Sequence, residues 1–148
     1  MKKVHFIGIG GIGISAIARF LKERDFIISG SDIADSAITK ELRASGMKIT
    51  VPHCKTAIED PDFVVYSAAI KGDNVELLEA RKRGIECLSR KEALPFILEG
   101  KRVFAVAGAH GKSTTSAMLA SLMEGSAIIG AISKEFGSNM KYEASDNL

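Results

Sequence analysis

Four glycines near the N-terminus have the spacing of a phosphate-binding loop. Gly8, Gly10 and Gly13 satisfy the pattern G-x-G-x-x-G, and Gly11 adds a further glycine within it. Glycine lets the backbone turn tightly and approach a pyrophosphate closely, and the helix that follows such a loop directs unpaired N–H groups at the anion. Because an apolar run precedes this loop and a helical pattern follows it, we expect the loop to hold the diphosphate of a nucleotide rather than serve strand–helix packing alone.

A second loop of the phosphate-binding type occurs later in the chain. Gly111-Lys112-Ser113 matches the end of a Walker A loop. In such loops the lysine reaches the β- and γ-phosphates of ATP and the hydroxyl binds Mg²⁺. We therefore predict Lys112 as the catalytic residue and Ser113 as the metal ligand. The strict motif has a glycine where this chain has Val106, so the match is to a shorter variant that opens at Gly108.

One acidic residue follows the second expected strand. Asp32 lies 19 residues after Gly13, where dehydrogenases bind the ribose of NAD. The same position can equally contact the nucleoside of a different nucleotide or cap the loop after the strand. Asp32 therefore does not identify which nucleotide binds.

Strands that alternate with helices are expected to position these loops. Short apolar runs bounded by turn residues predict strands at residues 4–9, 26–29, 47–51, 63–66 and 85–88. Helical spacing and capping residues, including the pair Ser89 and Glu92, predict helices at residues 14–23, 36–42, 73–83 and 89–98. This alternation predicts an α/β fold with a Rossmann-like, doubly wound parallel sheet.

The pattern starts again after the polar residues Glu99 to Lys101. An apolar run, the second glycine loop and a helical pattern predict a strand at residues 102–107 and a helix at 112–123, with one more strand at 127–129. From Ser133 onward there is no periodicity, and no closing element is expected. We therefore predict a nucleotide-binding domain over residues 1–99 and the incomplete start of an ATP-binding domain over residues 100–148.

Composition excludes several other classes of protein. The 20 basic and 18 acidic residues are interspersed and give a net charge of +2, unlike the basic stripe of a nucleic-acid-binding protein. No stretch approaches the roughly 18 apolar residues of a membrane span. Cys54 and Cys87 are far apart and no signal sequence precedes them, so we expect a cytoplasmic protein with reduced thiols, no membrane segment and no nucleic-acid partner.

Taken together, these segments resemble the N-terminal part of the Mur ligase family of peptidoglycan synthesis. The similar segments occur in the family's order and spacing, at residues 6–13, 29–32, 66–70 and 108–115. His110 is typical of the family branch that adds the first amino acid and of a related branch that attaches a peptide, and Gly10-Gly11-Ile12-Gly13 favours the first. Ala109 and Ser113 depart from the family's usual threonines, although Ser113 keeps a hydroxyl for magnesium.

The resemblance implies an ATP-dependent ligase of cell-wall biogenesis. Its substrates would be UDP-N-acetylmuramate and L-alanine, joined at the muramate carboxylate through an acyl phosphate, with Mg²⁺ bound to ATP. The stretch given by this sequence would bind the UDP substrate and be inactive alone. The UDP substrate would contact Gly10, Gly11, Ile12, Gly13, Asp32, Ser67, Ala68 and Ala69. ATP would contact Gly108, Ala109, His110, Gly111, Lys112, Ser113 and Thr114.

Two other classes of function stay open. An NAD-dependent oxidoreductase, or an NAD-binding regulatory module, explains the first loop and Asp32 but gives the second loop no role. A nucleotide sensor without catalytic activity is the third class. Two residues keep two roles each: His110 contacts substrate or caps its loop, and Arg90 is a phosphate partner or a solvated residue at a helix start.

Overall fold

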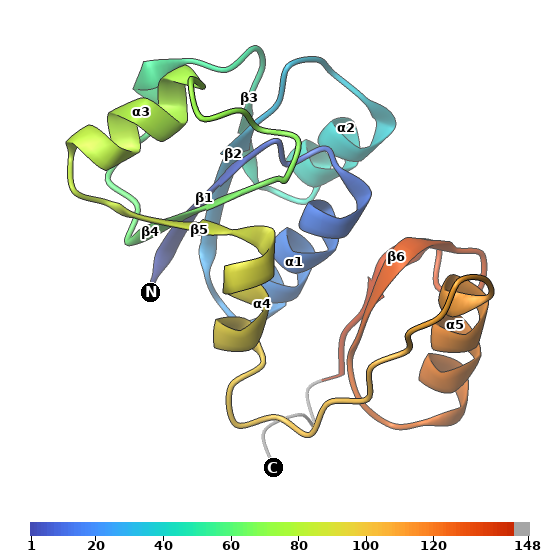
Figure 1. The fold of residues 1–148 in the computed structure, drawn as a ribbon. Helices are drawn as coiled ribbons and strands as arrows, with labels where there is room; N and C mark the ends of the chain where they lie inside the picture. The colour runs from blue at the N-terminus through green and yellow to red at the C-terminus, as the bar shows by residue number, and fades with distance from the viewer. Residues whose placement is uncertain (144–148) are drawn as a thin grey trace.

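The computed structural model describes residues 1–143, and its larger part is a five-stranded parallel sheet (Figure 1). The strand order is β3-β2-β1-β4-β5. The strands are β1 (Lys3–Ile7), β2 (Ile27–Ser31), β3 (Lys48–Thr50), β4 (Phe63–Tyr66) and β5 (Glu86–Ser89). The predicted Rossmann-like sheet is confirmed. The chain progresses outward from β1 in both directions, and open α/β sheets bind ligands at the carboxyl ends of the strands at this point.

Helices cover both faces of the sheet, as a doubly wound fold requires. One face carries α1 (Ile12–Glu23), α2 (Ala37–Ala44) and α4 (Arg90–Ile97), and the other carries α3 (Val75–Lys82) with the short 3₁₀ helix η1 (Lys55–Ala57). Strand β1 supplies both cores, because successive side chains of a strand alternate between faces. Val4 and Phe6 pack in the core beneath α1, whereas Ile7 packs in the core beneath α3.

Gly30 allows the first glycine loop to lie directly on strand β2. A Cβ at this position would be 2.8 Å from the carbonyl oxygen of Phe6 and 2.7 Å from Cδ1 of Ile9. The Ile9 side chain, which is fully buried, occupies the space above Gly30. The loop is therefore anchored by a buried isoleucine before it reaches the start of α1.

The second unit contains helix α5 (Lys112–Leu122) and a hairpin of β6 (Ala127–Ser133) and β7 (Ser138–Lys141). The expected helix and the strand near residue 127 are confirmed, but the strand expected at 102–107 is wrong. These residues pair with no other strand of residues 1–143, and Val103 and Phe104 are each about half exposed. An apolar run becomes a strand only where a neighbouring backbone completes its hydrogen bonds. Strand β7, for which no periodicity was found, closes the unit by antiparallel pairing with β6.

The hairpin of β6 and β7 packs against helix α1. Asn139 is buried, and its side-chain amide donates to the carbonyl of Ile12 at 2.5 Å and to the hydroxyl of Ser15 at 2.8 Å. Phe20 and Tyr142 meet edge to face with ring centroids 6.1 Å apart. Helix α1 is thus enclosed between the parallel sheet and the hairpin.

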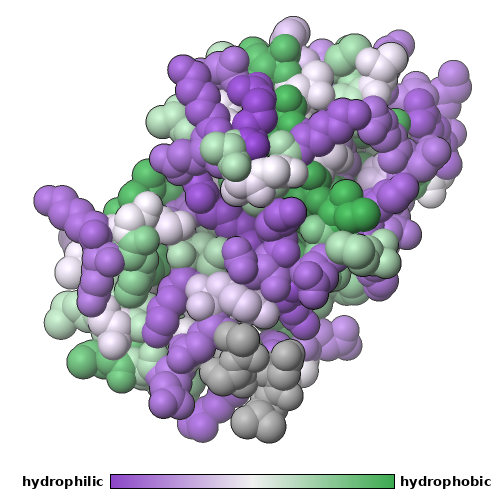
Figure 2. Space-filling model, turned by 180° about the vertical axis from the view of Figure 1, so that it is seen from behind, coloured by the Kyte–Doolittle hydropathy of each residue, from purple (hydrophilic) through white to green (hydrophobic). Residues whose placement is uncertain are grey.

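Apolar side chains also reach the surface in both parts of the structure. Ile33, Met118 and Leu122 are among the exposed ones, and on the face shown in Figure 2 the apolar patches are separated by hydrophilic residues. Across residues 1–143, no helix has the length and apolar character needed to cross a membrane.

Candidate functional site

A cleft of about 420 Å³ opens at the carboxyl ends of the central strands. It is lined by Gly8, Gly10, Gly11, Asp32, Ile33, Ala34, Asp35, Ser36, His53, Ser67, Ala69 and Ile70. The structure therefore brings together five of the substrate residues predicted from sequence: Gly10, Gly11, Asp32, Ser67 and Ala69. Ile12, Gly13 and Ala68 adjoin these residues in the chain but do not line the cleft.

The backbone of the first glycine loop is held by Asp32. One carboxylate oxygen accepts from the N–H of Gly10 at 2.7 Å, and the other accepts from the N–H of Ile33 at 2.7 Å. The N–H of Gly11 donates to the carbonyl of Gly8 at 3.3 Å. Two of the N–H groups expected to face a diphosphate are therefore used within the protein. Those of Ile12 and Gly13 have no acceptor in the described part of the chain, because they belong to the first turn of α1.

Arg90 covers the start of helix α1. A Cβ on Gly13 would lie 2.7 Å from the guanidinium carbon of Arg90, so only a glycine lets the guanidinium approach this closely without a shift. The side chain of Arg90 forms no hydrogen bond or ion pair with any residue from 1 to 143. An unpaired cation beside the positive end of a helix dipole is unfavourable by itself and becomes favourable when an anion lies between them.

The end of strand β4 forms the opposite wall of the cleft. The N–H of Ser67 donates to the carbonyl of Ile7 at 3.0 Å, which continues the pairing of β4 with β1. Gly8 has a φ of +79° and packs directly against Ser67, whose Cβ is 3.0 Å from the position that a Cβ on Gly8 would occupy. The loop and the β4 end therefore form one continuous surface.

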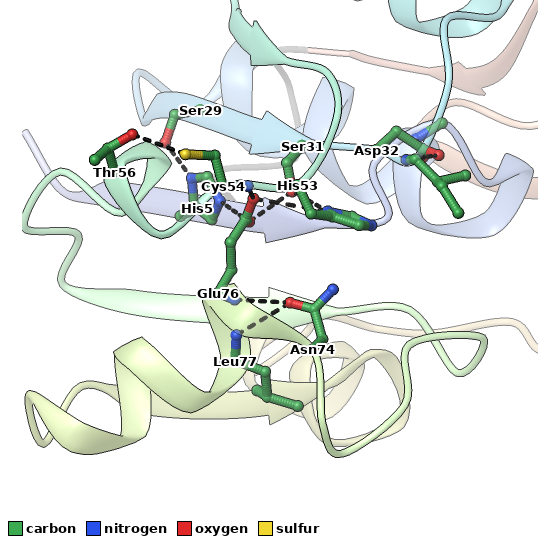
Figure 3. Close-up of polar contacts among 12 residues, drawn as sticks. His5, Ser29, Ser31, Asp32, His53, Cys54, Thr56, Asn74, Glu76 and Leu77 are labelled. Carbon is green, nitrogen blue, oxygen red and sulfur yellow. Dashed lines mark hydrogen bonds and ion pairs between the residues drawn. The ribbon is translucent and has the colours of Figure 1, made fainter.

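A buried polar cluster lies below the cleft, and Figure 3 shows its members around Glu76. Glu76 is fully buried and accepts from His5 Nε2 at 3.0 Å, from the Ser31 hydroxyl at 2.6 Å and from the Cys54 N–H at 2.7 Å. Burial alone would raise the pKa of the Glu76 carboxyl, but these hydrogen bonds outweigh burial and hold the pKa below its ordinary value. The carboxylate is therefore ionised and accepts hydrogen bonds only.

The cluster reaches the cleft through His53. Its Nδ1 lies 2.8 Å from the Ser31 hydroxyl and 3.7 Å from a Glu76 carboxylate oxygen. No role for these clustered residues was predicted from the sequence. The feature of the sequence that could have indicated the cluster is His5, which lies within the apolar run of the first strand. A polar side chain buried in a sheet needs a hydrogen-bond partner.

The second glycine loop precedes helix α5 and is exposed. Gly111 has a φ of +74°, in the left-handed region that glycine tolerates best. The ammonium group of Lys112 donates to the carbonyls of Gly108 at 2.6 Å and Ala109 at 3.2 Å, so the lysine is folded over its own loop. The side chains of His110 and Ser113 form no hydrogen bond with a described residue. Among residues 1–143, the His110 side chain therefore has no partner for the capping role.

A larger cavity of about 860 Å³ lies between α4, the segment after it, α5 and β6. Its lining includes the cationic side chains of Arg90, Lys101, Arg102 and Lys112, against one carboxylate, Glu124. Arg90 thus contacts the first glycine loop and shares a cavity with the lysine of the second. Within residues 1–143, His, Cys, Asp and Glu side chains form no group of three that could hold a metal ion.

Comparison with known proteins places this geometry in a family. The profile of the Mur ligase family, catalytic domain, matches residues 3–102. A UDP-N-acetylmuramate–L-alanine ligase from Campylobacter curvus is 75% identical over 148 residues, which is all of this chain and 34% of that protein. One from Campylobacter jejuni is 66% identical over 149 residues, covering 100% of this chain and 35% of that protein.

Solved structures agree with the sequence comparison. The structure of a UDP-N-acetylmuramate–alanine ligase from Thermotoga maritima has a TM-score of 0.90 and 34% sequence identity, covering 96% of this chain and 35% of that one. The chain spans about a third of the length of the curated relatives it matches. Since the family profile extends over more than half of the sequence, the chain belongs to the Mur ligase family.

Proposed function

We propose that the protein carrying this chain is an ATP-dependent ligase that joins L-alanine to the carboxylate of UDP-N-acetylmuramate in peptidoglycan precursor synthesis. Membership of the Mur ligase family and the names of the most similar relatives support this proposal. Residues 1–99 would bind the UDP-linked substrate, and residues 100–148 would begin the ATP-binding domain. The last five residues of that range lie outside the described part of the chain. The cytoplasmic location expected from the sequence stays a prediction.

The observation that carries the proposal is the position of Arg90 between the two glycine loops. Arg90 contacts Gly13 and lines the same cavity as Lys112 and Ser113. A diphosphate on the first loop and a triphosphate on the second would therefore approach one cationic cavity from two sides. A domain that binds only NAD has no use for the second loop.

The chemistry of amide formation accounts for these parts. A carboxylate is a poor acyl donor, so one of its oxygens first takes the γ-phosphoryl group of ATP, and ADP leaves. The amine nitrogen of L-alanine then attacks the carbonyl carbon, and inorganic phosphate leaves as the amide forms. The first step brings two anions together, and the Lys112 ammonium would reduce their repulsion.

The second loop suits ATP with Mg²⁺. Magnesium in such sites is held by substrate phosphates and few protein groups, and the unpaired Ser113 hydroxyl on the first turn of α5 is the ligand that this part of the chain would supply. Magnesium would neutralise phosphate charge there. Lys112 would leave the carbonyls of Gly108 and Ala109 to contact the β- and γ-phosphates. Ala109, His110, Gly111 and Thr114 would complete the loop around the triphosphate.

The first loop suits the diphosphate of the UDP substrate. The free N–H groups of Ile12 and Gly13 would donate to it, with Arg90 as the cationic partner. Gly10, Gly11, Asp32, Ser67, Ala68 and Ala69 would form the surrounding surface. Because UDP lies far from the reacting carboxylate, its binding energy would serve to position the muramate group.

Calorimetric titration of the full-length protein with UDP-N-acetylmuramate, NAD and ATP in turn tests the proposal. We expect UDP-N-acetylmuramate and ATP to bind and NAD to give no heat of binding. Binding of NAD without binding of the UDP-sugar would replace the ligase by an oxidoreductase or a regulatory module. Binding of both expected ligands without turnover in the presence of L-alanine would favour a nucleotide sensor.

A further inference from the structure

His53 is the cleft residue that the buried cluster controls. It follows strand β3 at the edge of the sheet, its side chain is 15% exposed, and it lines the cleft. Figure 3 shows the imidazole extending from Ser31 toward Asp32, away from Glu76. The Nδ1 of His53 is therefore held inside the protein, while the rest of the ring faces the cleft.

The buried cluster determines which ring nitrogen of His53 carries a proton. Because the Glu76 carboxylate can only accept hydrogen bonds, the Ser31 hydroxyl, 2.6 Å away, is the donor in their hydrogen bond. The Ser31 oxygen can then only accept from His53, and the Nδ1 of His53, 2.8 Å away, is the donor. In the neutral ring, proton occupancy of Nδ1 makes Nε2 an acceptor. In that form the cleft contains an imidazole nitrogen that accepts hydrogen bonds, and the buried cluster fixes the orientation of the ring.

The position of His53 determines which part of a bound nucleotide would lie next to it. The glycine loop follows β1 in the middle of the sheet, whereas His53 follows β3 at its edge, with residues 32–36 between them on the cleft wall. A nucleotide with its diphosphate on the loop reaches this edge with its nucleoside. Uracil carries an N–H at ring position 3, between two carbonyls, whereas cytosine has an unprotonated acceptor nitrogen at that position.

We propose that His53 determines base specificity, because its Nε2 accepts a hydrogen bond from the N3–H of uracil. This inference rests on the proposed binding of a UDP-linked substrate and adds the reason why the base is uracil. Ser31 and Glu76 act as positioning residues, since they hold the His53 ring and its proton without touching the base. Cytosine would place acceptor against acceptor and leave both groups without a partner, which costs more than a hydrogen bond gains.

The ratio of the dissociation constants for CDP and UDP, measured by calorimetry on the full-length protein, tests this inference. In the unaltered protein we expect UDP to bind at least about tenfold more tightly than CDP. In His53→Gln the side-chain amide can turn either its oxygen or its NH₂ group to the base, so the ratio should fall to about one. The ratio compares two ligands on one folded variant, so a general loss of affinity cancels.

Cys54→Ser is the matched control. Cys54 neighbours His53 in the same turn, but its thiol contacts Thr56 and does not line the cleft, so the CDP-to-UDP ratio should stay as in the unaltered protein. The role of His53 is overturned if the CDP-to-UDP ratio in His53→Gln equals that of the unaltered protein. It is also overturned if the ratio is close to one in the unaltered protein. In both cases the binding of UDP still stands. Failure of UDP and UDP-N-acetylmuramate to bind at all overturns the proposed function instead.

Discussion

The carboxylate of Asp32 accepts a hydrogen bond from the backbone N–H of Gly10 across 2.7 Å, and its second oxygen accepts from Ile33. One side chain at the end of β2 thereby fixes the glycine loop that follows β1. The residue that would bind ribose in a dehydrogenase is used here to shape the phosphate loop. The affinity of that loop for a diphosphate should therefore depend on Asp32 even without direct contact.

Asp32→Asn tests this dependence. An amide has one oxygen acceptor, so its NH₂ group would face either the Gly10 or the Ile33 donor, and the loop would lose one charge-assisted hydrogen bond. We expect the affinity for UDP-N-acetylmuramate to fall about tenfold, corresponding to about 1.4 kcal/mol. Calorimetry measures the change, with the exposed Asp73→Asn as the control. An unchanged affinity in Asp32→Asn would show that the loop keeps its shape without the carboxylate.

Gly11→Ala tests how closely the diphosphate approaches the backbone. Gly11 has φ −67° and ψ 140°, which any residue adopts, and an added Cβ would be 3.4 Å from its nearest neighbour on Ile14. The variant should fold normally, yet its methyl group would occupy the cleft surface. We expect at least about a tenfold loss of affinity for UDP-N-acetylmuramate. Gly72→Ala, which has open space around it, is the control, and retained affinity in Gly11→Ala would place the diphosphate elsewhere.

Arg90→Gln tests the electrostatic role of the guanidinium at Gly13. Loss of the cation should weaken binding of UDP-N-acetylmuramate about tenfold at low salt. The difference from the unaltered protein should shrink as salt rises, because salt screens exposed charges. Affinity is measured over a series of salt concentrations, with the neighbouring exposed Lys91→Gln as the control. Equal affinities of Arg90→Gln and the unaltered protein at low salt contradict a contact with phosphate.

Lys112→Ala tests the second loop in the full-length protein. Removal of the ammonium should lower kcat by at least about a hundredfold, since it would stabilise the transferred phosphoryl group. Binding of UDP-N-acetylmuramate should change by no more than about twofold, because Lys112 does not line the first cleft. Release of inorganic phosphate and calorimetry give the two readouts, and the exposed Lys134→Ala is the control. Normal turnover by Lys112→Ala would remove Lys112 from the reaction.

Glu76 should make stability depend on pH. Its folded pKa lies below the ordinary value of about 4.3, so its stabilising contribution is complete above that pH and is lost as pH falls through the folded pKa. Glu76→Gln should lower the free energy of unfolding at pH 7 by about 2 kcal/mol and flatten the acid dependence. Urea unfolding between about pH 3 and pH 7 measures both effects.

The exposed Glu99→Gln serves as the control for Glu76→Gln, because it removes a carboxylate that makes no hydrogen bond within the described chain. Its unfolding free energy should follow that of the unaltered protein over the same pH range. If the free energy of unfolding changes with pH as steeply in Glu76→Gln as in Glu99→Gln, then Glu76 does not account for the loss of stability in acid.

The three inner strands of the parallel sheet, β1, β2 and β4, could be predicted because each lies in a mainly apolar run ended by turn residues. Strands buried on both faces leave that signal in the sequence directly. The Ser89 and Glu92 capping box likewise predicted the start of α4. The strand expected at residues 102–107 failed because an apolar run does not reveal whether a partner strand lies beside it.

The site could be predicted only as far as local pattern determines it. The glycine loop was placed correctly at the end of β1, but the engagement of Gly10 by Asp32 depends on how two strand ends meet. Glu76 lies in a helix that also contains Glu79, Arg81 and Lys82, and its burial follows from the packing of α3 against the sheet, where it meets His5 of β1. No spacing in the sequence connects it to His5, 71 residues away.

The side-chain amide of Asn139 joins the hairpin to the first turn of α1 at Ile12 and Ser15. These two segments are more than 120 residues apart in the chain, so a chimaera of two Mur ligases would normally take them from different parents. A hairpin exchanged without its own residues 12–15 would keep the backbone carbonyl at position 12 as an acceptor, but it would lose the Ser15 hydroxyl wherever the new host has another residue at that position. Donor segments from relatives should therefore be transplanted in pairs, the helix start together with the hairpin.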